Sequence, residues 1–154
     1  MVHRLVVLEW LYKADQDFGF AEKSLEKGNL PYFDQISFLL HQAAEKYLKA
    51  YIVKFGLKFE KQHDLEKLLE IIIGHDSSLA ELKEACRLLT PFYFETRYPG
   101  AGLVLNREKA EEAMAQVRKI QAIIREELGI EKEVTKEDLE RENKAVDNIL
   151  RSKS

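Results

Sequence analysis

The side chains best suited to bind an anion are Arg97 and Tyr98, which lie in a polar turn shaped by a proline and a glycine. A guanidinium held in such a turn can bind a phosphate through two parallel hydrogen bonds. The neighbouring phenol can stack on a base or donate its hydroxyl. In the alternative interpretation, Arg97 pairs with Glu95 or Asp17 and only fixes the loop. The residues alone leave both roles open.

A second set of polar side chains follows one edge of an apolar segment with helical spacing. His41, Glu45 and Lys49 recur at four-residue steps, so they share one face, with Lys46 beside them. This edge can line a ligand-binding cleft. It can also be an ordinary surface row, in which the pair of Glu45 and Lys49 contributes roughly a few tenths of a kcal/mol. His63, ahead of the next apolar segment, is interpreted as a helix cap that can also touch a ligand.

Asp17 and Glu45 are expected to have structural roles. Asp17 lies near the apolar stripe of the first helical segment, so its carboxylate needs a partner if it is buried. A lysine, a backbone N–H group or Arg97 would satisfy it. Glu45 has Lys49 one helical turn away.

Other common kinds of site are missing from the sequence. The histidines at positions 3, 41, 63 and 75 have no metal-ligand spacing to one another or to Cys86, so no metal site is expected. A Walker loop, a glycine-rich dinucleotide turn and a serine or cysteine nucleophile motif are also absent. We therefore expect no cofactor.

Composition excludes several classes of partner and location. The 24 basic and 27 acidic side chains leave a net charge of −3, so long DNA or RNA is not an expected partner. A small phosphate ligand needs only one or two local cations. No apolar run approaches the roughly 20 residues of a membrane span, and the first residues lack the long apolar core of a signal peptide. We expect a cytoplasmic protein without a membrane segment.

The spacing of apolar residues predicts an all-α protein. Apolar side chains recur at three- and four-residue steps in five segments, and no segment alternates as a strand would. The predicted helices cover residues 5–27, 33–55, 65–74, 78–90 and 106–128. The second is apolar on more than one face, so it is either central or part of an interface. Residues 91–105, rich in proline, glycine and aromatic side chains, are expected to form a loop.

Two parts of the chain differ in character. Residues 1–130 contain the predicted helical bundle, and residues 131–154 form a charged tail with a thin apolar stripe. Thr135 and Asp138 have the spacing of a helix start. We therefore expect a bundle at residues 1–130 followed by a helical tail at residues 131–154.

Several motifs together make the chain recognisable. They are Asp17 in the first helix, Tyr32-Phe-Asp34, Gln42-Ala-Ala-Glu-Lys46, Leu48-Lys-Ala50, His63-Asp-Leu65 and Arg97-Tyr-Pro99. On these residues the chain resembles the HEPN family, the higher eukaryotes and prokaryotes nucleotide-binding domain, and in particular its small stand-alone prokaryotic members. The similarity spans roughly residues 5–128.

The resemblance implies an up-and-down four-helix bundle with a short extra helix, commonly as a homodimer. Such proteins are often encoded beside a minimal nucleotidyltransferase, as a two-component pair of the toxin–antitoxin kind. Many are metal-independent ribonucleases whose active site is an arginine followed four to six residues later by a histidine. In that chemistry the ribose 2′-OH attacks the phosphate, the histidine moves protons and the arginine stabilises the phosphate.

This sequence departs from the ribonuclease pattern. Its last histidine is His75, so no histidine follows Arg97, and no other arginine precedes a histidine at the required distance. Tyr98 does not easily replace the histidine, because the unperturbed pKa of a tyrosine is about 10. The usual mechanism therefore lacks its proton carrier.

We expect a non-catalytic homodimer that binds a nucleotide, or presents one to a partner nucleotidyltransferase. The residues expected to bind the nucleotide are Arg97, Tyr98, His41, Lys46, Lys49 and His63. One alternative is a metal-independent ribonuclease toxin with a degenerate active site. The other is a purely structural partner in which Arg97 only fixes its loop.

Overall fold

The structure is a computed structural model that describes residues 2–27, 31–95, 99 and 105–154. Within these ranges it contains helices and no strands, so the prediction of an all-α protein is confirmed. The elements in chain order are α1 (Val2–Glu26), α2 (Phe33–Lys54), α3 (Leu65–His75), η1 (Ser77–Leu82), α4 (Lys83–Leu89), α5 (Phe92–Glu95), α6 (Arg107–Leu128) and α7 (Lys136–Ser152).

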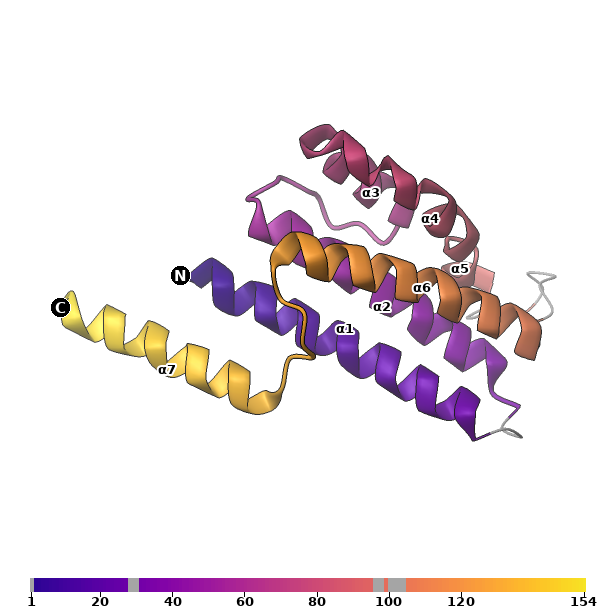
Figure 1. Cartoon of the computed structure of the whole chain (residues 1–154), viewed down its shortest axis with the longest axis horizontal. Helices are drawn as coiled ribbons and strands as arrows, with labels where there is room; N and C mark the ends of the chain where they lie inside the picture. The colour runs from indigo at the N-terminus through magenta and orange to yellow at the C-terminus, as the bar shows by residue number, and fades with distance from the viewer. Residues whose placement is uncertain (1, 28–30, 96–98, 100–104) are drawn as a thin grey trace.

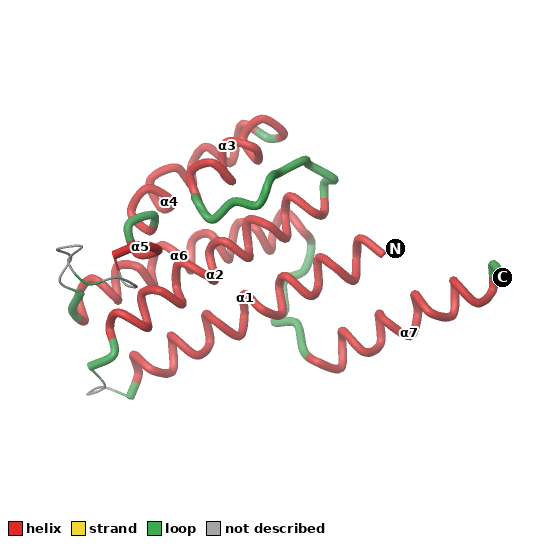
Figure 2. Tube along the Cα trace, turned by 180° about the vertical axis from the view of Figure 1, so that it is seen from behind, coloured by secondary structure: helices red, strands yellow, loops and turns green. Residues whose placement is uncertain are grey.

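The long helices α1, α2 and α6 run alongside one another as the body of an up-and-down bundle (Figure 1). Helix α2 returns antiparallel to α1, and α3, η1 and α4 cover the side of α2 away from α1. The last helix, α7, lies outside the bundle against α1, as the view from behind also shows (Figure 2). No helix among the described residues is long and apolar enough to cross a membrane.

Helix α2 is the centre of the bundle, which explains why its sequence is apolar on more than one face. It contacts α1, α3, α4, α5 and α6. Its middle turns are buried around most of the circumference, including the large side chains of Tyr47 and Tyr51. Leu39 and Val53, which lie toward its outer edge, still pack partly buried against the core. A single chain therefore covers most of the apolar surface of this helix.

Helix ends follow local capping chemistry. Asn106 accepts a hydrogen bond from the Lys109 N–H at 2.9 Å to start α6, and Gly129 ends it with a φ of 67°, in the left-handed region that glycine tolerates. Thr135 and Asp138 form a capping box at the start of α7, as their spacing predicts. Asp76 caps η1, because its carboxylate accepts the backbone N–H of Ser78 at 3.0 Å.

A buried ion pair and its hydrogen bonds tie four parts of the fold together: α1, α2, α6 and the segment before α7. Asp15 of α1 binds the guanidinium of Arg125 of α6 with both carboxylate oxygens, and it accepts a hydrogen bond from the Tyr47 hydroxyl at 2.6 Å. The backbone N–H of Val134 adds a third donor at 3.1 Å. Burial raises the pKa of the Tyr47 phenol, and the nearby Asp15 raises it further, so the phenol keeps its proton and donates.

The segment that leads into α7 is held more firmly than α7 itself. The Arg125 guanidinium donates to the carbonyl groups of Ile130 and Lys132, at 3.0 and 2.7 Å, and Val134 is buried. No side chain of α7 is buried, and Glu142 reaches Arg4 of α1 at 3.4 Å. The division of the chain at residue 130 stays a prediction.

Candidate functional site

Arg97 and Tyr98, the residues that the sequence singles out first, lie outside the described residues. Their proposed contacts with a nucleotide therefore stay predictions. Tyr93 of α5 stands four positions before Arg97 in the chain and is described.

The polar row on α2 is buried, so it is not an ordinary surface row. His41, Glu45 and Lys49 are exposed by only 1%, 5% and 6%. Glu45 Oε1 accepts from Lys49 Nζ at 2.6 Å and contacts His63 Nδ1 at 3.0 Å. Lys49 Nζ also lies 5.4 Å from the ring centre of Trp10, the one tryptophan of the chain. Glu45 and Lys49 of α2 thus connect Trp10 of α1 to the loop that precedes α3.

His63 is oriented by Glu45 and does not cap α3. The carboxylate of Asp64 is the cap, and it accepts the backbone N–H groups of Glu66 and Lys67. Asp64 suits this position because a carboxylate oxygen reaches two N–H groups of the first turn. The side chain of His63 is instead 40% exposed, with its Nδ1 against Glu45. The interpretation of His63 as a helix cap is therefore wrong. His63 lies beside the polar row of α2, in contact with Glu45.

Tyr93 joins the two histidines of the site. Its ring stacks on His63, with centroids 5.1 Å apart and planes inclined by 12°, and it lies 5.3 Å from the ring of His41. Tyr93 belongs to the aromatic stretch that was expected to be a loop, but residues 92–95 form the short helix α5. The sequence shows several aromatic side chains in this stretch, but nothing in their spacing indicates that Tyr93 contacts His63.

His41 is uncharged at neutral pH. Its burial lowers its pKa to about 4, although the nearby charge of Glu45 acts in the opposite direction. A neutral imidazole in this position can stack or form a hydrogen bond, but it adds no positive charge for a phosphate. The cations of the site must therefore come from lysines or arginines.

A hollow of about 420 Å³ opens beside this group of side chains. It is lined by Lys61, Gln62, His63, Asp64, Lys67, Thr90 and Tyr93. Neither Lys61 nor Lys67 forms an ion pair with a described residue, and both are exposed. The hollow thus combines a stacked pair of rings with two available ammonium groups.

Lys46 and Asp17 lie away from that hollow and pair with each other. Lys46 Nζ lies 2.5 Å from Asp17 Oδ2, and both side chains are about one-fifth exposed. The expectation that a lysine satisfies Asp17 fits this contact. The lysines of the hollow, Lys61 and Lys67, were missed because nothing in the spacing of a lysine-rich stretch distinguishes them.

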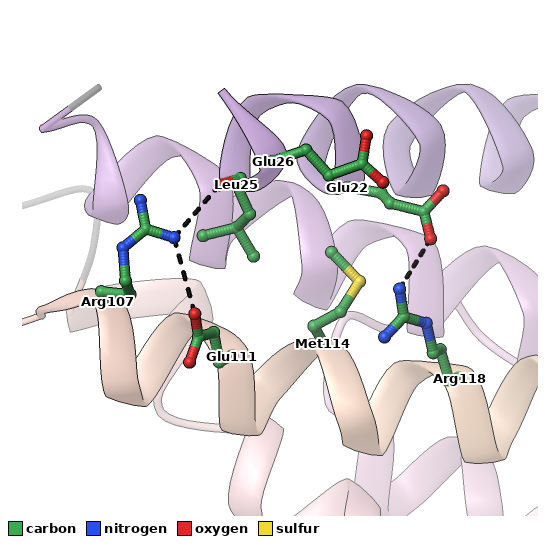
Figure 3. A pocket seen from close by; sticks show the side chains of 7 residues that line it. All are labelled: Glu22, Leu25, Glu26, Arg107, Glu111, Met114 and Arg118. Carbon is green, nitrogen blue, oxygen red and sulfur yellow. Dashed lines mark hydrogen bonds and ion pairs between the residues drawn. The ribbon is translucent and has the colours of Figure 1, made fainter. Parts of the chain in front are cut away.

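Two other hollows on the α1–α6 side are poorly suited to an anion. In the first, of about 320 Å³, Arg118 pairs with Glu22 at 2.7 Å, and Arg107 donates to the Leu25 carbonyl and to Glu111 (Figure 3). Its arginines are thus engaged by the protein itself. The second is lined by one arginine and by the carboxylates of Asp15, Glu22, Glu131 and Glu133, which repel a phosphate.

The comparison with protein families agrees with this architecture. A family model described as the HEPN domain matches residues 7–128. The chain belongs to the HEPN domain family. The resemblance recognised from the sequence motifs is therefore confirmed, and the matched residues extend from α1 to the end of α6.

Two solved structures resemble this HEPN protein. TT1696 from Thermus thermophilus is 30% identical, with a TM-score of 0.68, and the similarity covers 78% of this chain and 96% of that one. ST0689, an archaeal HEPN homologue, is 22% identical, with a TM-score of 0.63, and the similarity covers 79% of this chain and 96% of that one. The second likeness concerns the fold alone. No curated protein matches the sequence.

Proposed function

We propose that this HEPN protein binds a nucleotide in the hollow between the start of α3 and α5. The observation that carries the proposal is that the stacked rings of His63 and Tyr93 share one hollow with Lys61 and Lys67. Aromatic faces bind bases of any sequence by stacking, and ammonium groups bind phosphates. Membership of a family named for nucleotide binding supports the same conclusion.

The buried row of α2 holds this surface in place. Glu45 fixes His63 through a hydrogen bond, and Lys49 compensates the buried charge of Glu45. Within the proposal, His41 supports the Tyr93 ring, Lys49 acts through Glu45, and Lys46 remains paired with Asp17. Arg97 and Tyr98 follow Tyr93 in the chain. In the proposal, their guanidinium and phenol groups also contact the nucleotide.

The proposed setting is a homodimer that works with a minimal nucleotidyltransferase in a toxin–antitoxin-like pair. The family resemblance carries this part of the proposal. Exposed apolar side chains support a role in association, above all Phe20 at 66% and Tyr32 at 59% exposure. A nucleotide held at the surface by rings and lysines is also accessible to an enzyme that transfers nucleotidyl groups.

Titration with ATP tests the nucleotide-binding part. The emission of Trp10 reports on the site, because Lys49 connects Trp10 to Glu45 and His63. We expect saturable binding by the wild type and about tenfold weaker binding by Lys67→Ala, which removes one charged contact to phosphate. Lys136→Ala, which removes another exposed lysine in a first helical turn and outside the hollow, is the matched control and should bind as the wild type does. No saturable signal with the wild type, by fluorescence or calorimetry, refutes the proposal.

A ribonuclease activity is the second candidate, and the environment of His63 favours it. The sequence pattern lacks a histidine after Arg97, whereas His63 lines the hollow with Nδ1 held by a buried carboxylate. With Nδ1–H donating to Glu45, Nε2 is left to take the proton of an attacking 2′-OH. RNA cleavage by the wild type that His63→Ala abolishes, and that His75→Ala leaves unchanged, would establish this activity. Intact RNA with all three proteins rules it out.

A further inference from the structure

Asp64 places a negative charge in a hollow that otherwise suits an anion. It lines the same hollow as Lys61 and Lys67, which stand three positions before and after it in the chain. A carboxylate repels a phosphate at short range and lowers the affinity for any purely anionic ligand. The presence of this carboxylate therefore needs a physical reason.

Helix capping explains only one of its two oxygens. Oδ1 accepts the backbone N–H groups of Glu66 and Lys67, at 2.9 and 3.3 Å. Oδ2 forms no hydrogen bond or ion pair with the described part of the chain. Asparagine and serine cap helices about as well as aspartate, so the cap does not require the charge of the second oxygen.

The ligand itself can supply the missing donor. A nucleotide carries hydroxyl groups on its ribose, next to its phosphates, and an acidic side chain that accepts from a ribose 2′-OH is a known means of recognition in other nucleotide-binding folds. Such a hydrogen bond is charge-assisted and offsets the repulsion between the carboxylate and the phosphates.

We infer that Asp64 Oδ2 accepts a hydrogen bond from the ribose 2′-hydroxyl, so that this site selects ribonucleotides over 2′-deoxyribonucleotides. The inference rests on the proposed function, because it assigns a specificity to the same hollow. Lys61 and Lys67 hold the phosphates, the rings of His63 and Tyr93 hold the base, and Asp64 distinguishes the sugar.

Calorimetric titration of the full chain with ATP and with 2′-dATP tests the inference. We expect the wild type to bind ATP about tenfold more tightly, the effect of one hydrogen bond to a charged group. Asp64→Asn keeps a capping oxygen but replaces the accepting Oδ2 by an NH₂ group, so it should bind both nucleotides equally. Asp76→Asn is the matched control, because Asp76 caps η1 in the same manner outside the hollow, and it should keep the wild-type preference.

The outcomes separate the inference from the function on which it rests. Equal affinity of the wild type for the two nucleotides overturns the selection of ribose and leaves nucleotide binding intact. A preference that Asp64→Asn retains also overturns the role of Asp64. Absence of binding by either nucleotide refutes the proposed function together with the inference. Equal affinities of the wild type overturn the selection of ribose even if Asp64→Asn does not fold, and Asp64→Ser, which also keeps a capping oxygen, then tests the role of Asp64.

Discussion

At the scale of single residues, the chemistry of the site depends on which side chains are buried. Sequence spacing placed His41, Glu45 and Lys49 on one helix face, and the structure keeps them there. The spacing alone does not show whether such a row is buried or lies on the surface. Its burial depends on the loop before α3 and on α5, which are distant in the sequence and pack over α2. Contacts between distant segments also bring Tyr93 and Lys67 into the site, so no local sequence pattern identifies them as site residues.

The buried His41 makes stability depend on pH in a defined window. Its pKa is about 4 in the folded protein, against 6.5 for an unperturbed histidine, so the unfolded chain binds the proton first as the pH falls. The stability contributed by neutral His41 is complete above pH 6.5 and is lost as the pH falls from 6.5 toward 4. A shift of this size corresponds to about 3 kcal/mol in the free energy of unfolding.

Urea unfolding at a series of pH values measures this effect as a difference between proteins. The wild type should lose stability relative to His41→Gln between pH 6.5 and 4. His75→Gln, which changes an exposed histidine, should follow the wild type. Parallel curves for the wild type and His41→Gln would show that His41 has the same pKa in the folded and the unfolded protein, which would contradict the prediction.

At the scale of elements, the helices were largely predictable and their connections were not. The ends of α6 follow from Asn106 and Gly129, and α7 begins at the capping box that Thr135 predicts. These signals are local, so they can be read from the sequence. The link of α1 to α6 through Asp15 and Arg125 joins residues 110 positions apart, and no local pattern reveals it.

Two carboxylates on α1 allow a matched test of that link. Asp15→Asn leaves the buried guanidinium of Arg125 without its counter-charge, so we expect a loss of about 3–5 kcal/mol in the free energy of unfolding. Asp17→Asn weakens a more exposed pair with Lys46, and the loss should be below about 1 kcal/mol. Chemical denaturation measures both free energies of unfolding. Equal losses for the two variants would contradict the larger contribution of the Asp15 ion pair to stability.

At the scale of the whole molecule, the fold accounts for the apolar surface of α2 without a second copy. Leu39 and Val53 are packed against the core, and Phe38 lies 6.3 Å from the ring of Tyr93. From the sequence alone, this helix could be either central or part of an interface. The most exposed large apolar side chain among the described residues is that of Phe20 on α1, so we propose that the homodimer interface includes it.

Sedimentation equilibrium tests the proposed homodimer. We expect a mass of twice the 17.9 kDa of the chain, and a shift toward the single-chain mass for Phe20→Ser. Leu150→Ser, which changes an exposed leucine at the far end of α7, should leave the mass unchanged. A wild-type mass of one chain at all concentrations rules out the dimer.

A crystal structure of the protein with ATP tests the central claim most directly. We predict that the base stacks against the rings of His63 and Tyr93 and that the phosphates lie within hydrogen-bonding distance of Lys61 and Lys67. ATP bound instead in the hollow of Arg107 and Arg118, or a fully unoccupied hollow at saturating ATP, would contradict the account.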